Sequence, residues 1–335
     1  MRAIFTIFQT LFLFLTSNKA IENKWLHQQV KYTLQSDNMS ASVNPPKIRH
    51  FIFGYGSLVC SKSRKITAPT LTKPAHPVVI NHLRRTWTAR VPHRGDKIRE
   101  DLDQLKGQTA MGIEIAQNHN CTGVLIEVDD DQLAQFDERE KGYNRVEIDL
   151  HHIFDTDHLK RNEEDHDSVE HSHDVLKVAH AKRKSMTGSI QNDANIDQER
   201  DEYDNYKVWV YVPKNGGTGA DHEYPIMQSY VDIIMRGCLS IGKDFAMQFL
   251  QSTHGWWHDK TVHHPESEVP EYLWIDDRHE PFYVRADEEW SSDMKHMLDD
   301  MLKEIHPEPF EKRRHLTTLS SKNNSTEDSK TESSH

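Results

Sequence analysis

The chain contains few cysteines, and their spacing excludes the common cysteine-based sites. Its 335 residues include three cysteines, Cys60, Cys121 and Cys238. They cannot all pair within one chain, they form no C-x-x-C unit, and their spacing does not support a zinc site. We therefore expect three buried thiols, with a redox-sensitive Cys60 as the less favoured alternative.

The glycine-rich motifs of nucleotide-binding proteins are also missing. Gly54, Gly56 and Ser57 do not complete a dinucleotide fingerprint, because position 59 is not a glycine. Neither a Walker loop nor the Gly-x-Ser-x-Gly elbow of serine hydrolases occurs in the sequence. These absences argue against nucleotide-dependent enzymes and against the commonest hydrolase fold.

Acidic residues outnumber basic ones, and apolar residues are few. The formal net charge is -12 at pH 7 and only 36% of the residues are hydrophobic. Acidic and basic residues are mixed along the chain, so no basic face is available for a nucleic-acid backbone. We expect no nucleic-acid partner, and we expect long polar segments beside a folded domain.

What the sequence does contain is a short loop motif, Tyr55-Gly56-Ser57-Leu58, directly after the apolar run 51–54. A strand that ends in a glycine-containing loop turns several backbone N–H groups toward one point. Such a loop can bind a carboxylate, so these four residues are candidates for substrate binding.

A second segment, residues 137–143, supplies a candidate base. Leu133, Phe136 and Glu140 lie at i, i+3 and i+7 of a predicted helix over residues 130–141, so they share one face. Glu138 and Arg139 are expected to point elsewhere.

The position of Glu140 along this helix predicts its chemistry. Gly142 is a suitable helix stop, which places Glu140 in the last turn. The carbonyl end of the helix dipole and partial burial both disfavour a carboxylate, so we expect a raised pKa for Glu140. A surface Glu paired with a neighbouring Lys or Arg is the alternative.

Together, these residues resemble the γ-glutamylcyclotransferase-like superfamily and its ChaC-type branch. Its signatures are a Y-G-S-L or Y-G-S-N loop after the first strand and a later Glu in an R-E-K-G-Y-like segment. Residues 83–87, 109–113 and 123–128 look like the strands of its barrel in their usual order. The resemblance covers residues 48–153 and extends over 207–287. It implies an α+β fold, a small mixed, mainly antiparallel β-barrel with covering helices.

The resemblance also implies a reaction. The α-amine of a γ-glutamyl compound attacks its own γ-carbonyl and releases 5-oxoproline and an amine, with no metal or organic cofactor required. Glu140 would be the catalytic acid and base, and the loop N–H groups would bind the α-carboxylate or polarise the carbonyl. Tyr143 would orient Glu140. The R-E-K-G-Y-like segment favours glutathione as the small-molecule substrate.

Three alternatives remain open. A related enzyme could act on γ-glutamylamines or an acylated natural product, and a non-catalytic member could bind a γ-glutamyl or carboxylate ligand. The third is a His-rich metal-binding protein, which the histidines around residues 155–205 suggest without a fixed ligand pattern: His151, His152, His158, His166, His171, His173 and His180. We favour a disordered insert for 155–205, because its composition cannot bury enough apolar surface to form a core.

The N-terminus indicates targeting. Arg2 precedes the apolar run 3–15, which is short for a membrane span and suits a signal-peptide core that Ser17 or Ala20 could end. We expect residues 1–20 to direct the chain to the secretory pathway or an organelle, with a signal anchor or a buried segment as alternatives. Similar enzymes are often cytosolic, so a cytoplasmic location is the alternative compartment. No other stable membrane partner is expected.

The remaining boundaries follow from composition and periodicity. A polar lead-in spans 21–47, the γ-glutamylcyclotransferase-like domain 48–290, a C-terminal helix 291–305 and a disordered tail 306–335. Expected strands are 49–54, 77–80, 85–91, 110–115, 123–128, 146–153 and 207–212. Helices are expected from Pro225 and over 243–253, and a strand or extended arm over 282–285.

Overall fold

A computed structural model of the chain describes residues 47–92, 105–156, 174–186, 205–214, 219–256 and 274–315. The chain divides into two units, Met1–Pro46 and Lys47–His335, and all described residues belong to the second. The predicted targeting segment and nearly all of the lead-in therefore lie outside the described residues. Within the described ranges, no helix is both long and apolar enough to span a membrane.

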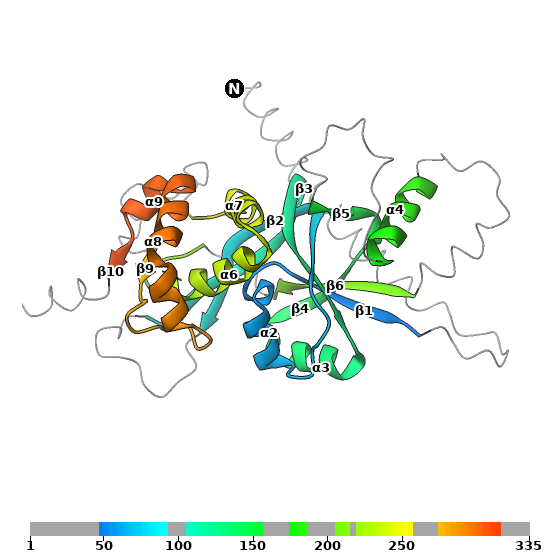
Figure 1. The fold of residues 1–335 in the computed structure, drawn as a ribbon, viewed down its shortest axis with the longest axis horizontal. Coiled ribbons are helices and arrows are strands. Elements are labelled where there is room, and N and C mark those ends of the chain that lie inside the picture. Colours follow the sequence, from blue (N-terminus) through cyan, green and yellow to red (C-terminus); the bar gives the residue numbers. More distant parts are fainter. Residues whose placement is uncertain are drawn as a thin grey trace, which may run out of the picture. The chain divides into compact units, whose positions relative to one another are not determined.

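Strand β1 (Arg49–Gly54) lies in the middle of the sheet and leads directly into the loop 55–58 (Figure 1). It pairs antiparallel with β3 (Gly107–Val128) and parallel with β6 (Tyr206–Pro213). Phe51, Ile52 and Phe53 are all fully buried. Burial of consecutive residues means that both faces of β1 are covered, which explains its continuous apolar run.

The longest ladder joins β2 (His76–Pro92) to β3. Each contains two of the predicted strands, so four predicted strands are in fact two. The register between them shifts from Asn81 to Leu83, and the intervening His82 has a positive φ of 63°. A β-bulge of this kind bends and twists a strand without ending it, which is why the break in the sequence pattern is not a break in the strand.

The rest of the sheet is mixed. Strand β4 (Tyr143–Ile148) pairs antiparallel with β6, and five short strands complete the pairing: β5 (Ile153–Asp155), β7 (Ile226–Met227), β8 (Thr253–His254), β9 (Trp274–Asp276) and β10 (Arg314–His315). The expected α+β character is confirmed. The order β10-β9-β7-β3-β1-β6-β4 leaves β10 and β4 at its two ends, so neither the closed barrel nor its mainly antiparallel character is confirmed among the described strands.

Most of the described helices lie beside this sheet in two groups (Figure 1). The first contains η1 (Ser57–Val59), α2 (Ser61–Thr67) and α3 (Asp130–Arg139). The second contains α6 (Gln228–Ile241), α7 (Lys243–Gln251), α8 (Glu288–Ile305) and α9 (Pro307–Glu311). Helix α6 joins the two groups because it packs on η1: a Cβ added to Gly237 would lie only 2.5 Å from the nitrogen of Cys60.

The prediction of a disordered insert is wrong for part of its length. Helix α4 (Asp174–Met186) forms inside it and contacts β5 and the short helix η3 (Leu150–His152). Leu176, Val178 and Ala179 are buried, and Lys182 forms an ion pair with Asp149 at 2.6 Å. The average composition of 155–205 is polar, so it conceals one short segment with enough apolar residues to dock.

The predicted C-terminal boundaries also need correction. Helix α8 begins at Glu288, so the boundary expected at 291 falls inside this helix. The tail expected to be disordered from 306 begins with α9 and β10, and the side chain of Arg313 is only 6% exposed because it pairs with Asp299. The helix predicted from Pro225 is preceded by β7, and the three cysteines are buried free thiols, as expected.

Candidate functional site

Hydrogen bonds hold the loop 55–58 in place, among them those of a buried arginine. Tyr55 is buried and its hydroxyl donates to the carbonyl of Tyr211. The Arg64 side chain, on α2, donates to the carbonyl oxygens of Leu58 and Val59, at 2.7 Å each. Burial lowers the pKa of Arg64 to about 10, so its guanidinium stays charged at neutral pH.

Backbone hydrogen bonds close the turn that follows the start of the loop. The N–H groups of Val59 and Cys60 donate to the carbonyls of Gly56 and Ser57, at 2.9 and 3.2 Å. Among the described backbone hydrogen bonds outside helices and strands, none is donated by the N–H group of Gly56 or Ser57. Loop N–H groups without an internal acceptor suit a carboxylate, although their binding role stays a prediction.

Glu140 lies where the helical spacing places it, near the buried side of α3. The helix starts with a capping box formed by Asp129 and Gln132, and it ends at Arg139 with Glu140 as its C-cap. The Glu140 N–H donates to the Phe136 carbonyl at 2.9 Å. Its side chain is only 15% exposed, so it belongs to the interior and not to the solvated surface.

Arg139 is the main residue that the sequence analysis misses. It is expected to point away from the apolar face, but its side chain is 8% exposed and its Nε lies 2.8 Å from Glu140 Oε1. Nη2 donates to Ser57 Oγ at 2.9 Å. One guanidinium therefore connects the predicted base to the predicted binding loop.

The other N–H groups of Arg139 are also engaged. Nη1 donates to Thr67 Oγ1 at 2.9 Å and to the Ser63 carbonyl at 3.2 Å, and Nη2 donates to Ser63 Oγ at 3.2 Å. Together with the contacts to Ser57 and Glu140, these use all five donors of the side chain. The close guanidinium stabilises the carboxylate form of Glu140, which acts against the raised pKa expected for it, and that raised pKa stays a prediction.

Three tyrosines surround the same site. Burial raises the pKa of Tyr143 well above its ordinary value, and the neighbouring Tyr230 and Glu140 add to this effect, which places Tyr143 near the predicted base. Its orienting role stays a prediction. Tyr230, on α6, lies against the loop, since a Cβ added to Gly56 would be 3.0 Å from the Tyr230 hydroxyl oxygen. The rings of Tyr230 and Tyr283 meet edge to face at 4.8 Å.

A second arginine approaches from the C-terminal part of the chain. Burial and the positive charge of Arg139 lower the pKa of the half-buried Arg285, while Tyr283 and Glu140 act in the opposite direction. Arg285 is therefore close enough to Glu140 and Arg139 to be influenced by both. It is separated from them by more than 140 positions, so no local motif indicates its presence.

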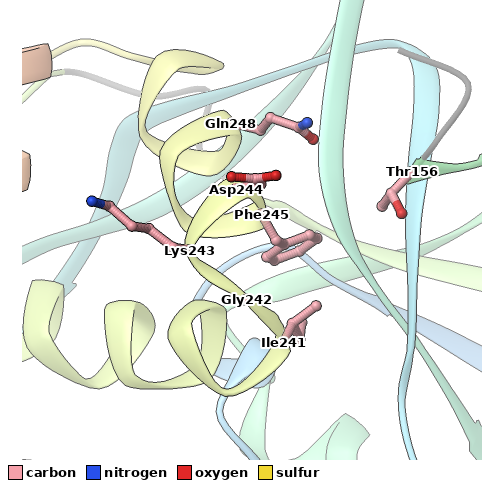
Figure 2. Close-up of a pocket in the computed structure, with 7 residues that line it drawn as sticks. All are labelled: Thr156, Ile241, Gly242, Lys243, Asp244, Phe245 and Gln248. Carbon is pink, nitrogen blue, oxygen red and sulfur yellow. The ribbon is translucent and has the colours of Figure 1, made fainter. Parts of the chain in front are cut away.

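A cavity of about 440 Å³ lies elsewhere, at the start of α7 (Figure 2). Its lining consists of Thr156, Ile241, Gly242, Lys243, Asp244, Phe245 and Gln248. Figure 2 shows Phe245 and Gln248 on the side of α7 that faces Thr156. None of the predicted site residues lines this cavity, so it is not part of the site around Glu140.

The structure describes only some of the histidines that suggest a metal-binding protein. The rings of His151 and His152 lie 3.7 Å apart, and burial, helped by His151 and His82, lowers the pKa of His152 to about 4. In the described part of the chain, no three His, Cys, Asp or Glu residues form a group that could hold a metal ion. His158, His166, His171 and His173 lie outside the described residues.

Comparison with known proteins gives one family and several distant structural likenesses. Residues 50–212 match the family described as ChaC-like protein. A structure of an uncharacterised protein from Homo sapiens shares 12% identity and a TM-score of 0.36, over 74% of this chain and 99% of that chain. A structure named Gamma-glutamyl cyclotransferase shares 11% identity and a TM-score of 0.36, with the same coverage.

A yeast γ-glutamyl cyclotransferase specific to glutathione shares 12% identity with a TM-score of 0.28, over 83% of this chain and 99% of that chain. No match was found among curated proteins. The likeness to the ChaC-like family therefore comes from the sequence match over residues 50–212.

Proposed function

We propose that the chain is a γ-glutamylcyclotransferase that releases 5-oxoproline from a γ-glutamyl peptide or amine, and the match of residues 50–212 to the ChaC-like family supports this proposal. The reaction is an intramolecular aminolysis. The substrate's α-nitrogen forms a bond to its own γ-carbonyl carbon, and the bond from that carbon to the leaving nitrogen breaks. Ring closure already holds the two reacting atoms together, so the protein must mainly bind the substrate and move protons.

In this proposal Glu140 carries the proton. Its carboxylate accepts a proton from the substrate's α-ammonium group and returns one to the leaving nitrogen, which departs as an amine. The N–H groups of the loop 55–58 bind the α-carboxylate or polarise the γ-carbonyl. Tyr143 orients Glu140 through its hydroxyl group.

The observation that carries the proposal is the contact of Arg139 with both halves of the site. Its Nε lies 2.8 Å from Glu140 Oε1, and its Nη2 donates to Ser57 Oγ at 2.9 Å. A base and a carboxylate-binding loop from separate parts of the sequence are thereby held next to each other. Arg139 is a positioning residue here, because all its donors already have protein partners.

Glutathione is the substrate that we favour, since the segment Arg139-Glu140-Lys141-Gly142-Tyr143 has the R-E-K-G-Y form. The test is a panel of γ-glutamyl compounds that contains glutathione, γ-glutamyl dipeptides and γ-glutamylamines, with 5-oxoproline as the measured product. Release from glutathione supports the proposal. Turnover of many dipeptides with none on glutathione would contradict the substrate, and release from no compound would contradict the enzyme.

A further inference from the structure

The C-terminal arm, residues 277–286, is fixed at its base by a buried carboxylate. Asp277 is 1% exposed and accepts hydrogen bonds from the N–H and the hydroxyl of Ser229, at 2.7 and 2.6 Å. It also accepts from the N–H of Phe282 at 2.7 Å, and the N–H of Tyr283 donates to Ser229 Oγ at 3.1 Å. The arm is thus attached to the first turn of α6.

Ion pairs strengthen this attachment. The Arg278 side chain donates to both carboxylate oxygens of Asp232 on α6, at 2.7 and 3.0 Å, and to Asp299 on α8 at 2.8 Å. Asp232 is fully buried. Side chains in such a network are held in one geometry, so the position of the end of the arm is fixed.

The end of the arm lies at the site around Glu140. The strand or extended arm expected over 282–285 contains a turn instead, in which the Ala286 N–H donates to the Tyr283 carbonyl at 2.9 Å. The turn places the Tyr283 ring 4.8 Å from the Tyr230 ring, and Tyr230 in turn contacts the loop 55–58. Arg285 lies two residues after Tyr283 in the same turn and is half-buried, and Arg139 and Glu140 are among the charged groups that act on its pKa.

The charges at this point do not balance. The guanidinium group of Arg139 contacts the one carboxylate here, that of Glu140, and the same carboxylate acts on the pKa of a second guanidinium group, that of Arg285. Every donor of Arg139 is already engaged with Glu140 or with neutral oxygens. Among the described residues, Arg285 forms no ion pair with a carboxylate. A half-buried cation without a protein counter-ion favours an anionic ligand.

We propose that Arg285, aided by Tyr283, binds a carboxylate on the leaving half of the substrate, so that the site selects γ-glutamyl peptides with a free C-terminal carboxylate over γ-glutamylamines. The inference rests on the proposed function, in which the loop N–H groups already bind the α-carboxylate. Arg285 therefore determines specificity and takes no part in the proton transfer.

The test compares two substrates that differ in one group, glutathione and its C-terminal amide. For the unaltered chain we expect KM to be about 10- to 100-fold lower for the acid, the range typical of hydrogen bonds between charged groups. Arg285→Gln should raise KM for the acid to that for the amide with little change in kcat, and Arg285→Lys should keep part of the preference. Lys295→Gln, which removes the same charge from an exposed position of α8, should change neither value.

Equal KM values for acid and amide in the unaltered chain would overturn the inference, and this comparison needs no variant. An equal loss on both substrates in folded Arg285→Gln would also overturn it, because Arg285 would then bind the γ-glutamyl half. If the unaltered chain releases no 5-oxoproline, the proposed function fails. Calorimetric titration with the acid and the amide then still tests Arg285, and equal affinities would contradict its role.

Discussion

Two segments reach the site from opposite ends of the described chain, and they are anchored by different chemistry. The loop 55–58 is held by guanidinium groups that donate to neutral oxygens, those of Leu58, Val59 and Ser57. The C-terminal arm is held by buried carboxylates, whose partners are the serine and amide groups around Asp277 and the guanidinium of Arg278. The guanidinium groups that hold the loop keep their charge near neutral pH, whereas the carboxylate of Asp277, which holds the arm, titrates.

This difference separates the two tasks that we assign to the site. The loop belongs to the region that matches the ChaC-like family, and in our proposal it binds the γ-glutamyl half that all substrates share. The arm lies beyond residue 212, and in our proposal it binds the half that differs between substrates. A change in the arm should therefore alter selectivity, while a change near the loop should alter turnover of every substrate.

The largest effect on stability is expected from the buried ion pair at the base of the arm. The side chains of Arg278 and Asp232 are 7% and 1% exposed. Arg278→Met removes one charge and leaves Asp232 buried without its counter-ion, so we expect a loss of about 3–5 kcal/mol in the free energy of unfolding in urea.

The matched control for that variant is Lys312→Met, because Lys312 pairs with Glu308 at 3.1 Å where both side chains are more than half exposed. Exposed pairs contribute roughly 0–1 kcal/mol. Similar losses in the two variants would mean that the network around Arg278 does not stabilise the arm.

The second effect concerns pH. Burial raises the pKa of Asp277 to about 6, above an ordinary value of 3.8. The folded state therefore binds this proton more tightly than the unfolded state. The contribution of Asp277 to stability is fully present below about pH 4 and is lost as the pH rises through about 6, a change of about 3 kcal/mol.

Asp277→Asn removes the titrating group, so the difference in unfolding free energy between the variant and the unaltered chain should change with pH over this window. Asp293→Asn, at an exposed position of α8, is the control and should follow the unaltered chain. An unchanged pH profile in Asp277→Asn would show that the arm is not held by a titrating carboxylate.

The smallest effect is expected where α6 packs against the loop. A Cβ at Gly237 would lie 2.5 Å from the nitrogen of Cys60 and 2.6 Å from the carbonyl carbon of Val59. Gly237→Ala should cost about 1–3 kcal/mol through overpacking, less the roughly 1 kcal/mol that alanine gains over glycine in a helix. Thermal unfolding measures the net change.

Gly219→Ala is the control, because nothing lies within 4 Å of a Cβ at that position. Since Gly237 faces the loop, its variant should also turn over γ-glutamyl acids and amides more slowly to the same extent. A loss of turnover confined to the γ-glutamyl acids would contradict the assignment of the γ-glutamyl half of the substrate to the loop and of the other half to the arm.

The sequence predicts well what local pattern determines. The apolar run of β1, the loop after it and the face of α3 that carries Glu140 follow from spacing within a dozen residues. The four predicted strands that form β2 and β3 also lie where expected. The bulge at His82 that joins two of them could not be foreseen, because a positive φ at a histidine leaves no pattern of its own.

What the sequence does not predict depends on distant partners. Arg139 lies three residues after Phe136, a spacing that places it near the buried face, but the direction of its long side chain is decided by Ser57 and Ser63. Arg285 and Tyr283 reach the site only through the attachment of Asp277 to Ser229. Helix α4 is concealed by the polar composition around it.

The central claim is that Glu140 carries the proton, and the most direct test is Glu140→Gln with glutathione as substrate. Glutamine keeps the size and hydrogen-bonding capacity but cannot accept the ammonium proton, so 5-oxoproline release should fall by about 10²- to 10⁴-fold with folding little changed. Glu138→Gln, whose carboxylate is 77% exposed and pairs with Lys141, should remain active. Near-normal release by Glu140→Gln, or an equal loss in both variants, would contradict the account.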